Sequence, residues 1–401
     1  MNPTPLTLGL AALLPLPALA QHAMLLPEPP PLADAAAPAV QGLAQIEVVF
    51  VLDTTGSMSG LIDGAKRKIW SIANVIATAT PRPQIRMGLV AYRDRGDSYI
   101  TQVTPLTDDI DKLYSDLMGL RADGGDDTPE SVNQALHEAL TSIQWLSGPA
   151  ARQPGVLQVM YLVGDCPPHM DYKDDVKYTD TCQAAASRGI VINTIQCGSD
   201  GDTTPIWQAI ARSAEGQFFQ VEQSGGVISI STPFDGDLAR LGSELEATLI
   251  DYGDPTVLAA QSEKREVQSR LAVAAPSDAA ADRASYNASA AGAKNLYGAQ
   301  ELVQDVLDGK VKLKDVPDSQ LPEAMRALSL ADREQYVQTR AQQRVTIRAQ
   351  VDALTIQRDN VIKAELAKAG ADGADSFDQS VVKALRDQAH RRGIQLSGDA
   401  K

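Results

Sequence analysis

Short apolar runs alternate with amphipathic stretches between about Ile46 and Glu222. The run IEVVFVLD, which ends in Asp53, is rich in β-branched residues and predicts a strand buried on both faces. Further strands are predicted at 84–94, 99–103, 155–165, 189–198 and 216–222. Apolar residues spaced three and four apart predict helices at 59–78, 108–118, 129–143, 179–187 and 205–214, with Pro129 in the first turn of its helix. Strands that alternate with helices in this way predict an α/β domain with a doubly wound, mainly parallel sheet.

The first 44 residues differ in pattern from the rest of the chain. Residues 1–20 hold an apolar stretch that is too short and too proline-rich to span a bilayer. They end in Ala18-Leu19-Ala20, a small-x-small sequence typical of signal-peptide cleavage, although no Lys or Arg precedes it. We therefore expect a signal peptide at 1–20 and a secreted or periplasmic protein. Residues 21–44 are rich in Pro and Ala and predict an extended linker.

Beyond residue 225 the pattern becomes mainly helical, so the predicted α/β domain spans 45–225. Residues 226–330 predict a helical connector that is partly mobile in its Ala-, Ser- and Asp-rich part, near 274–292. From 331 to 401 the apolar spacing predicts long amphipathic helices, beginning with either one long helix or a bent pair. A coiled coil or an oligomer contact through these helices is an alternative to packing within the chain. No window holds about 18 consecutive apolar residues, so we expect no transmembrane segment in the mature chain.

Oxygen-bearing side chains follow three of the predicted strands. Asp53, Thr55 and Ser57 alternate along a turn and would face the same way. An acidic loop lies at 123–129, and Asp165 ends the strand at 155–165. Because the carboxyl ends of parallel strands meet at one edge of a sheet, we expect these side chains to converge, and hard oxygen donors suit Mg²⁺. Each fragment alone could be a helix cap or a solvated turn, but together the carboxylates would repel one another without a cation.

These motifs resemble those of a von Willebrand factor A domain with a metal-ion-dependent adhesion site. The resemblance rests on three phrases: DTTGSM, which starts at Asp53, GGDDTPES, which starts at Gly124, and DCPPH, which starts at Asp165. It covers roughly 45–222 and is strongest for the bacterial and alpha-kinase-associated branch of the family, although no kinase-like segment is present. The resemblance implies a Rossmann-like fold and a divalent cation, Mg²⁺ or alternatively Mn²⁺ or Ca²⁺.

The resemblance also implies which residues hold the cation: Asp53, Thr55, Ser57 and Asp165. The remaining ligand, usually a threonine, falls in the second loop, whose register leaves three alternatives, Asp126, Asp127 and Thr128. An aspartate there would neutralise more of the cation's charge than a threonine and would weaken its attraction for a partner's carboxylate. The implied function is the binding of a protein partner that presents an Asp or Glu, without catalysis.

The overall charge narrows the choice of partners. Lys and Arg total 36 and Asp and Glu total 51, which gives a formal charge of −15 and argues against a nucleic-acid partner. Two other functions remain as alternatives: a structural or assembly protein whose metal is purely stabilising, and a metal-assisted hydrolase. The hydrolase is disfavoured because the four histidines are scattered and no general base stands apart from the ligand set, so we expect no enzymatic activity.

The chain has three cysteines, Cys166, Cys182 and Cys197. In an oxidising compartment they predict one disulfide and one free thiol. A catalytic Cys166 with His169 as its base is the competing interpretation. It is disfavoured because two prolines hold the loop between them rigid and no third orienting group is evident.

Overall fold

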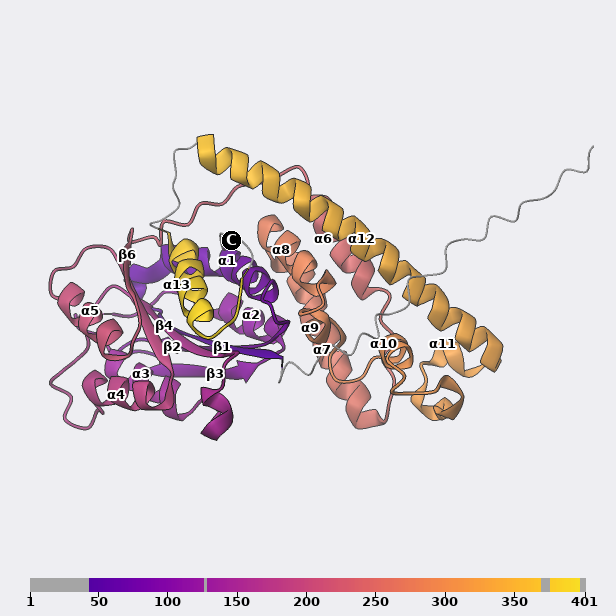
Figure 1. Ribbon diagram of the computed structural model, residues 1–401, viewed down its shortest axis with the longest axis horizontal. Helices are drawn as coiled ribbons and strands as arrows, with labels where there is room; N and C mark the ends of the chain where they lie inside the picture. Colours follow the sequence, from indigo (N-terminus) through magenta and orange to yellow (C-terminus); the bar gives the residue numbers. More distant parts are fainter. Residues whose placement is uncertain (1–42, 126–127, 369–375, 397–401) are drawn as a thin grey trace, which may run out of the picture. The chain divides into compact units, whose positions relative to one another are not determined.

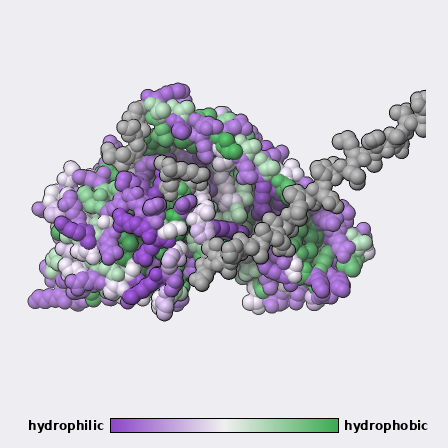
Figure 2. Space-filling model, viewed as in Figure 1, coloured by the Kyte–Doolittle hydropathy of each residue, from purple (hydrophilic) through white to green (hydrophobic). Residues whose placement is uncertain are grey.

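The computed structural model describes residues 43–125, 128–368 and 376–396. The predicted signal peptide and all but the last two residues of the predicted linker lie outside this part of the chain, as do Asp126 and Asp127. None of the helices within the described ranges combines the length and apolar character needed to cross a bilayer. Figure 2 shows hydrophilic residues over much of the visible face of the described part.

A six-stranded sheet in the order β3-β2-β1-β4-β5-β6 forms the centre of the first half of the chain (Figure 1). Its strands are β1 (Ala44–Asp53), β2 (Pro83–Tyr92), β3 (Thr101–Thr107), β4 (Val156–Gly164), β5 (Val191–Cys197) and β6 (Phe218–Val221). The edge strand β3 is antiparallel to β2, and the other neighbouring pairs are parallel. Residues of β1 and β4 are almost all buried because helices cover both faces of the sheet. The predicted doubly wound, mainly parallel α/β fold is confirmed.

Each face of the sheet has its own layer of helices and its own apolar core. One face carries α1 (Ser59–Ala77), α2 (Ile110–Gly119) and α13 (Phe377–Arg391). The other carries α3 (Val132–Thr141), α4 (Tyr178–Arg188) and α5 (Thr203–Ser213). Short 3₁₀ turns lie at η1 (Gly56–Met58) and η2 (Gly148–Arg152).

The prediction that Pro129 opens a helix is wrong. Helix α3 begins at Val132, three residues later. Glu130 instead forms an isolated parallel bridge with Pro168, and its backbone N–H donates to Pro167 O at 2.9 Å. This pairing keeps the backbone extended at Glu130 and delays the start of the helix.

The second half of the chain contains a helical arm, which we define as residues 235–368. Its elements are α6 (Asp235–Glu246), α7 (Pro255–Ala274), α8 (Ser277–Ala288), α9 (Ala293–Tyr297), α10 (Leu302–Leu307), η3 (Leu313–Asp315), η4 (Asp318–Gln320), α11 (Glu323–Arg326) and α12 (Leu330–Lys368). Where we expected a mobile stretch, the structure has helix α8, which packs on α1 and α6 and has eight of its twelve residues buried. Asn74 of α1 donates to Asp282 O of α8 at 2.8 Å. The arm is therefore joined to the sheet domain by side-chain contacts as well as by the chain.

Helix α12 is a single helix of 39 residues (Figure 1). Its buried positions include Val337, Arg344, Ile347, Val351 and Arg358, and they face α6, α8 and α10 of the same chain. Two of these positions are arginines, which explains why the apolar spacing looked irregular in the sequence.

The C-terminal helix α13 returns to the sheet domain. Tyr161 of β4 donates its hydroxyl to Val381 O at 3.1 Å, and the ring of Phe377 lies 6.1 Å from that of Phe50 on β1. The backbone of Gln395 pairs with that of Thr80, just after α1. The sheet domain is thus assembled from two separate stretches of chain, with the helical arm inserted between β6 and α13.

Candidate metal-binding site

Asp53, at the carboxyl end of β1, uses only one of its two carboxylate oxygens in hydrogen bonds within the described part of the protein. Asp53 is fully buried, and its Oδ1 accepts hydrogen bonds from the backbone N–H of Thr55 at 2.9 Å and from Thr55 Oγ1 at 2.7 Å. Its Oδ2 is buried and has no hydrogen-bond partner among the described residues. Thr55 Oγ1 lies 3.4 Å from Ser57 Oγ. Because the Thr55 hydroxyl donates its hydrogen bond to Asp53, the lone pairs of its oxygen stay available to a cation.

The strand β4, which neighbours β1 in the sheet, is followed by a second aspartate that also has one hydrogen-bonded carboxylate oxygen and one without a partner among the described residues. Asp165 directly follows β4, and its Oδ2 accepts from Gln223 Nε2 at 2.6 Å. Its Oδ1 is buried and has no partner within the described ranges. The backbone carbonyl of Asp165 accepts from Thr203 Oγ1 at 3.0 Å, which fixes the loop from the side of α5. Sequence reasoning missed Gln223, because nothing in its neighbourhood marks it as a partner of an acid 58 positions away.

The loop at 123–125 lies against the Asp53 loop. Asp123 N–H donates to Thr54 O and Gly56 N–H donates to Gly124 O, both at 3.1 Å. Gly125 has a positive φ of 78°, and a Cβ there would come within 2.9 Å of Thr55 Cβ, so this close approach requires glycine. Of the three alternatives for the remaining ligand, Asp126 and Asp127 lie outside the described residues, and Thr128 is exposed. The register of that ligand stays a prediction.

Glu130 is a buried acid next to this loop that sequence reasoning missed. It is 1% exposed, and a Cβ on Gly125 would lie 3.2 Å from its Oε1. Its Oε2 is buried and has no partner in the described part of the chain. Its position in the sequence could have indicated this, because Glu130 directly follows the acidic loop at 123–129. The prediction that a helix starts at Pro129 instead placed Glu130 in the first turn of that helix.

The electrostatics of this edge disfavour negative charge in the protein alone. Burial, together with Asp165 and Asp97, raises the pKa of Asp53 to about 7 although Thr55 donates to it. Burial and the same acids, with Asp53 and Asp94, raise the pKa of Glu130 to about 9. In the described ranges no Lys or Arg forms an ion pair with Asp53, Glu130 or Asp165. Buried carboxylates without a positive partner are costly, and a cation would remove that cost.

The donor set at this edge fits a hard divalent cation. The free oxygens of Asp53 and Asp165 and the hydroxyls of Thr55 and Ser57 are the kind of ligand that Mg²⁺ and Ca²⁺ prefer. Within the described residues, no three His, Cys, Asp or Glu side chains converge closely enough to hold a metal by themselves. A cation here would therefore depend on the hydroxyl groups and on the second loop as well as on the two aspartates.

The expected disulfide is absent. Cys166, Cys182 and Cys197 all lie in the described part of the chain, and all three are free thiols. Cys182 packs in the core on one face of the sheet and Cys197 in the core on the other, so the sheet separates them. Burial raises the pKa of Cys182 to about 12, and burial followed by the charge of Asp165 raises the pKa of Cys166, so neither thiol is activated.

A comparison with protein families finds a match for the sequence of the sheet domain. Residues 47–223 match the family model of the von Willebrand factor A domain. The matched von Willebrand factor A region contains Asp53, Thr55, Ser57, Asp165 and Gln223, and it ends before the helical arm and α13.

Individual relatives are distant. The chain is 24% identical over 221 residues to the "Putative ariadne-like RING finger protein R811" of Acanthamoeba polyphaga mimivirus; the match covers 51% of this chain and 21% of that protein, about a fifth of its length. Among solved structures, BatB from Bacteroides thetaiotaomicron is 17% identical with a TM-score of 0.33, covering 44% of this chain and 90% of that one. The VWA domain of SpRpn10 is 16% identical with a TM-score of 0.34, covering 46% of this chain and 92% of that one.

Proposed function

We propose that this protein is an exported protein-binding module of the adhesion or assembly type, whose von Willebrand factor A domain holds a divalent cation in a metal-ion-dependent adhesion site. The observation that carries the proposal is the matched state of Asp53 and Asp165. Each has one carboxylate oxygen that accepts hydrogen bonds, two at Asp53 and one at Asp165, and one buried oxygen without a partner in the described chain. The DTTGSM and GGDDTPES phrases favour the bacterial and alpha-kinase-associated branch.

The residues of the site have separate roles in this proposal. Asp53 and Asp165 offer their free oxygens to the cation, and Thr55 and Ser57 offer hydroxyl oxygens. Gln223 fixes the orientation of Asp165, and the loop at 123–128 supplies the remaining ligand. The cation, which we propose to be Mg²⁺ or else Mn²⁺ or Ca²⁺, supplies an open coordination position for an Asp or Glu of a protein partner.

Glu130 bears on the strength of partner binding. It adds a buried carboxyl group to the edge that already contains Asp53 and Asp165; its raised pKa keeps it protonated in the protein alone, and a bound cation would favour its ionised form. More negative charge around the cation lowers its attraction for a partner's carboxylate. We therefore propose that the cation is held firmly and that the partner's acid is held weakly, so that neighbouring loops supply much of the partner affinity.

Calorimetric titration of Mg²⁺ and Mn²⁺ into the wild type and into Asp53→Ala tests the site. We expect binding by the wild type and a loss of at least about a hundredfold in affinity in the variant. Identical traces for the two proteins would refute the site. Partner binding is then tested by crosslinking in the native envelope with Mg²⁺ or with EDTA. A partner captured equally well in EDTA and by Asp53→Ala would mean that the cation only stabilises the fold.

A further inference from the structure

Tyr92 carries a buried hydroxyl that lacks an acceptor. It is the last residue of β2, its side chain is fully buried, and its Oη has no hydrogen-bond partner in the described part of the chain. Two other buried tyrosines have acceptors: Tyr161 donates to Val381 O at 3.1 Å, and Tyr252 donates to Asp305 Oδ2 at 3.0 Å. An unsatisfied buried hydroxyl is destabilising, so its position calls for an explanation.

The hydroxyl of Tyr92 borders the same small space as the free oxygen of Asp53. The two residues are direct neighbours in the parallel register of β1 and β2. From the other side, a Cβ on Gly164 of β4 would lie 2.5 Å from Tyr92 Oη, 2.9 Å from Asp53 Cβ and 3.0 Å from Asp53 Oδ2. Glycine at 164 therefore leaves room for the phenol and the carboxylate to face each other, and any larger residue would fill that room.

Tyr92 Oη and Asp53 Oδ2 both lack a hydrogen-bond partner in the described chain, and each could be the partner of the other. Tyr92 Oη has a proton to donate, and Asp53 Oδ2 has lone pairs to accept it. One water molecule between two such groups makes hydrogen bonds nearly as favourable as a direct one.

We propose that Tyr92 is a positioning residue of the cation site, whose hydroxyl donates to Asp53 Oδ2, directly or through one water, and so holds that oxygen in the direction of the cation. The inference rests on the proposed function, because it assigns to Tyr92 a task in the same site. It adds a donor from β2 to a ligand set that otherwise comes from the loops after β1, α2 and β4.

The variant Tyr92→Phe tests this role, since it removes the hydroxyl and keeps the ring. Tyr114→Phe is a matched control: Tyr114 of α2 is also fully buried with a hydroxyl that has no partner in the described chain, but it packs against Trp70 away from the site. In EDTA, Tyr114→Phe should unfold at the wild-type temperature or above it, because it loses an unsatisfied polar group, whereas Tyr92→Phe should unfold at the wild-type temperature or below it, because Asp53 loses its donor. In calorimetric titration, Tyr92→Phe should bind Mg²⁺ about tenfold more weakly, whereas Tyr114→Phe should match the wild type.

Three results would overturn the inference. If Tyr92→Phe binds Mg²⁺ as tightly as the wild type while Asp53→Ala does not bind it, the site exists and Tyr92 has no part in it. If Tyr114→Phe loses as much affinity as Tyr92→Phe, the effect comes from the core in general. If the wild type itself binds no divalent cation, the proposed function fails and this inference fails with it.

Discussion

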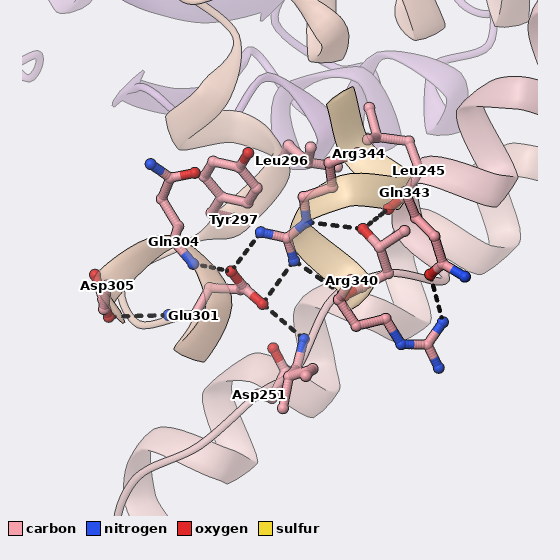
Figure 3. Close-up of polar contacts among 12 residues, drawn as sticks. Leu245, Asp251, Leu296, Tyr297, Glu301, Gln304, Asp305, Arg340, Gln343 and Arg344 are labelled. Carbon is pink, nitrogen blue, oxygen red and sulfur yellow. Dashed lines mark hydrogen bonds and ion pairs between the residues drawn. The ribbon is translucent and has the colours of Figure 1, made fainter. Parts of the chain in front are cut away.

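The helical arm and the carboxyl edge of the sheet both bury acidic side chains, but they differ in what neutralises them. In the arm, Glu301 is 1% exposed and makes two contacts with the guanidinium of Arg344, at 2.8 and 2.9 Å (Figure 3). At the sheet edge, Asp53 and Glu130 are equally buried and have no Lys or Arg partner in the described chain. Desolvation is therefore costly in both regions, but among the described residues only the buried acid of the arm has an arginine paired with it.

The effect of a paired arginine on the pKa of a buried acid is seen by comparing two fully buried aspartates, Asp111 and Asp53. Burial alone would raise the pKa of Asp111 on α2, but Arg283 of the arm more than offsets this and holds the pKa below its usual value. For Asp53, burial is only partly offset by the Thr55 hydrogen bonds, and the pKa rises to about 7. A buried acid with a built-in arginine contributes to the fold, and a buried acid without one is suited to an ion from solution.

The largest effect is expected from breaking an arginine pair in the arm. Arg344→Met leaves Glu301 buried without its counter-charge and leaves Thr248, which accepts from Arg344 Nε at 2.8 Å, without that donor. We expect the free energy of unfolding to fall by about 3–5 kcal/mol, measured by chemical denaturation. The double variant Arg344→Met, Glu301→Gln should recover part of the loss, because no charge is then left buried alone and the amide oxygen can still accept from the backbone N–H of Ile250 or Gln304. A single variant as stable as the wild type would show that the pair is not what neutralises Glu301.

Removing a buried charge at the sheet edge should change the free energy of unfolding in the opposite direction. Asp53→Asn removes a buried charge that has no counter-ion, while the remaining oxygen can still accept from Thr55. In EDTA at pH 8, above the raised pKa of Asp53, we expect the free energy of unfolding to stay equal or to rise by about 1–2 kcal/mol. The stabilisation that Mg²⁺ gives to the wild type should disappear in the variant. A destabilised metal-free variant would mean that the edge, like the arm, is already neutralised by the protein.

The sequence predicts the sheet edge far better than the arm, for a physical reason. The strands β1 and β4 are continuous apolar runs, and the fold rules for parallel sheets then bring the residues after them to one edge. Asp53, Thr55 and Ser57 are also close in sequence, so their convergence follows from local geometry. The predicted disulfide is not seen among the three cysteines of the described chain, and counting cysteines does not show which face of the sheet each one occupies.

The arm depends on pairs that sequence spacing does not reveal. Arg283 and Asp111 are 172 positions apart, and Arg344 and Glu301 are 43 apart. An arginine at a buried helix position looks like an interruption of the apolar stripe until its acid is known. The return of α13 was missed for a similar reason, since an amphipathic helix indicates burial but does not say against which surface.

The smallest effect expected is at Gln223, the side chain that orients Asp165. Gln223→Met keeps the length of the side chain and removes the hydrogen bond from Nε2 to Asp165 Oδ2. Because Gln223 is exposed, water can replace part of that bond, and we expect Mg²⁺ affinity to fall only about three- to tenfold in calorimetric titration. Gln220→Met is the matched control, because Gln220 donates to Gly198 O at 2.8 Å and not to an acid of the site. Equal affinities for both variants, whether reduced or unchanged, would show that the orientation of Asp165 does not depend on Gln223. The free oxygen of Asp165 would then have to be held in place by the backbone of its loop, where Thr203 contacts the Asp165 carbonyl.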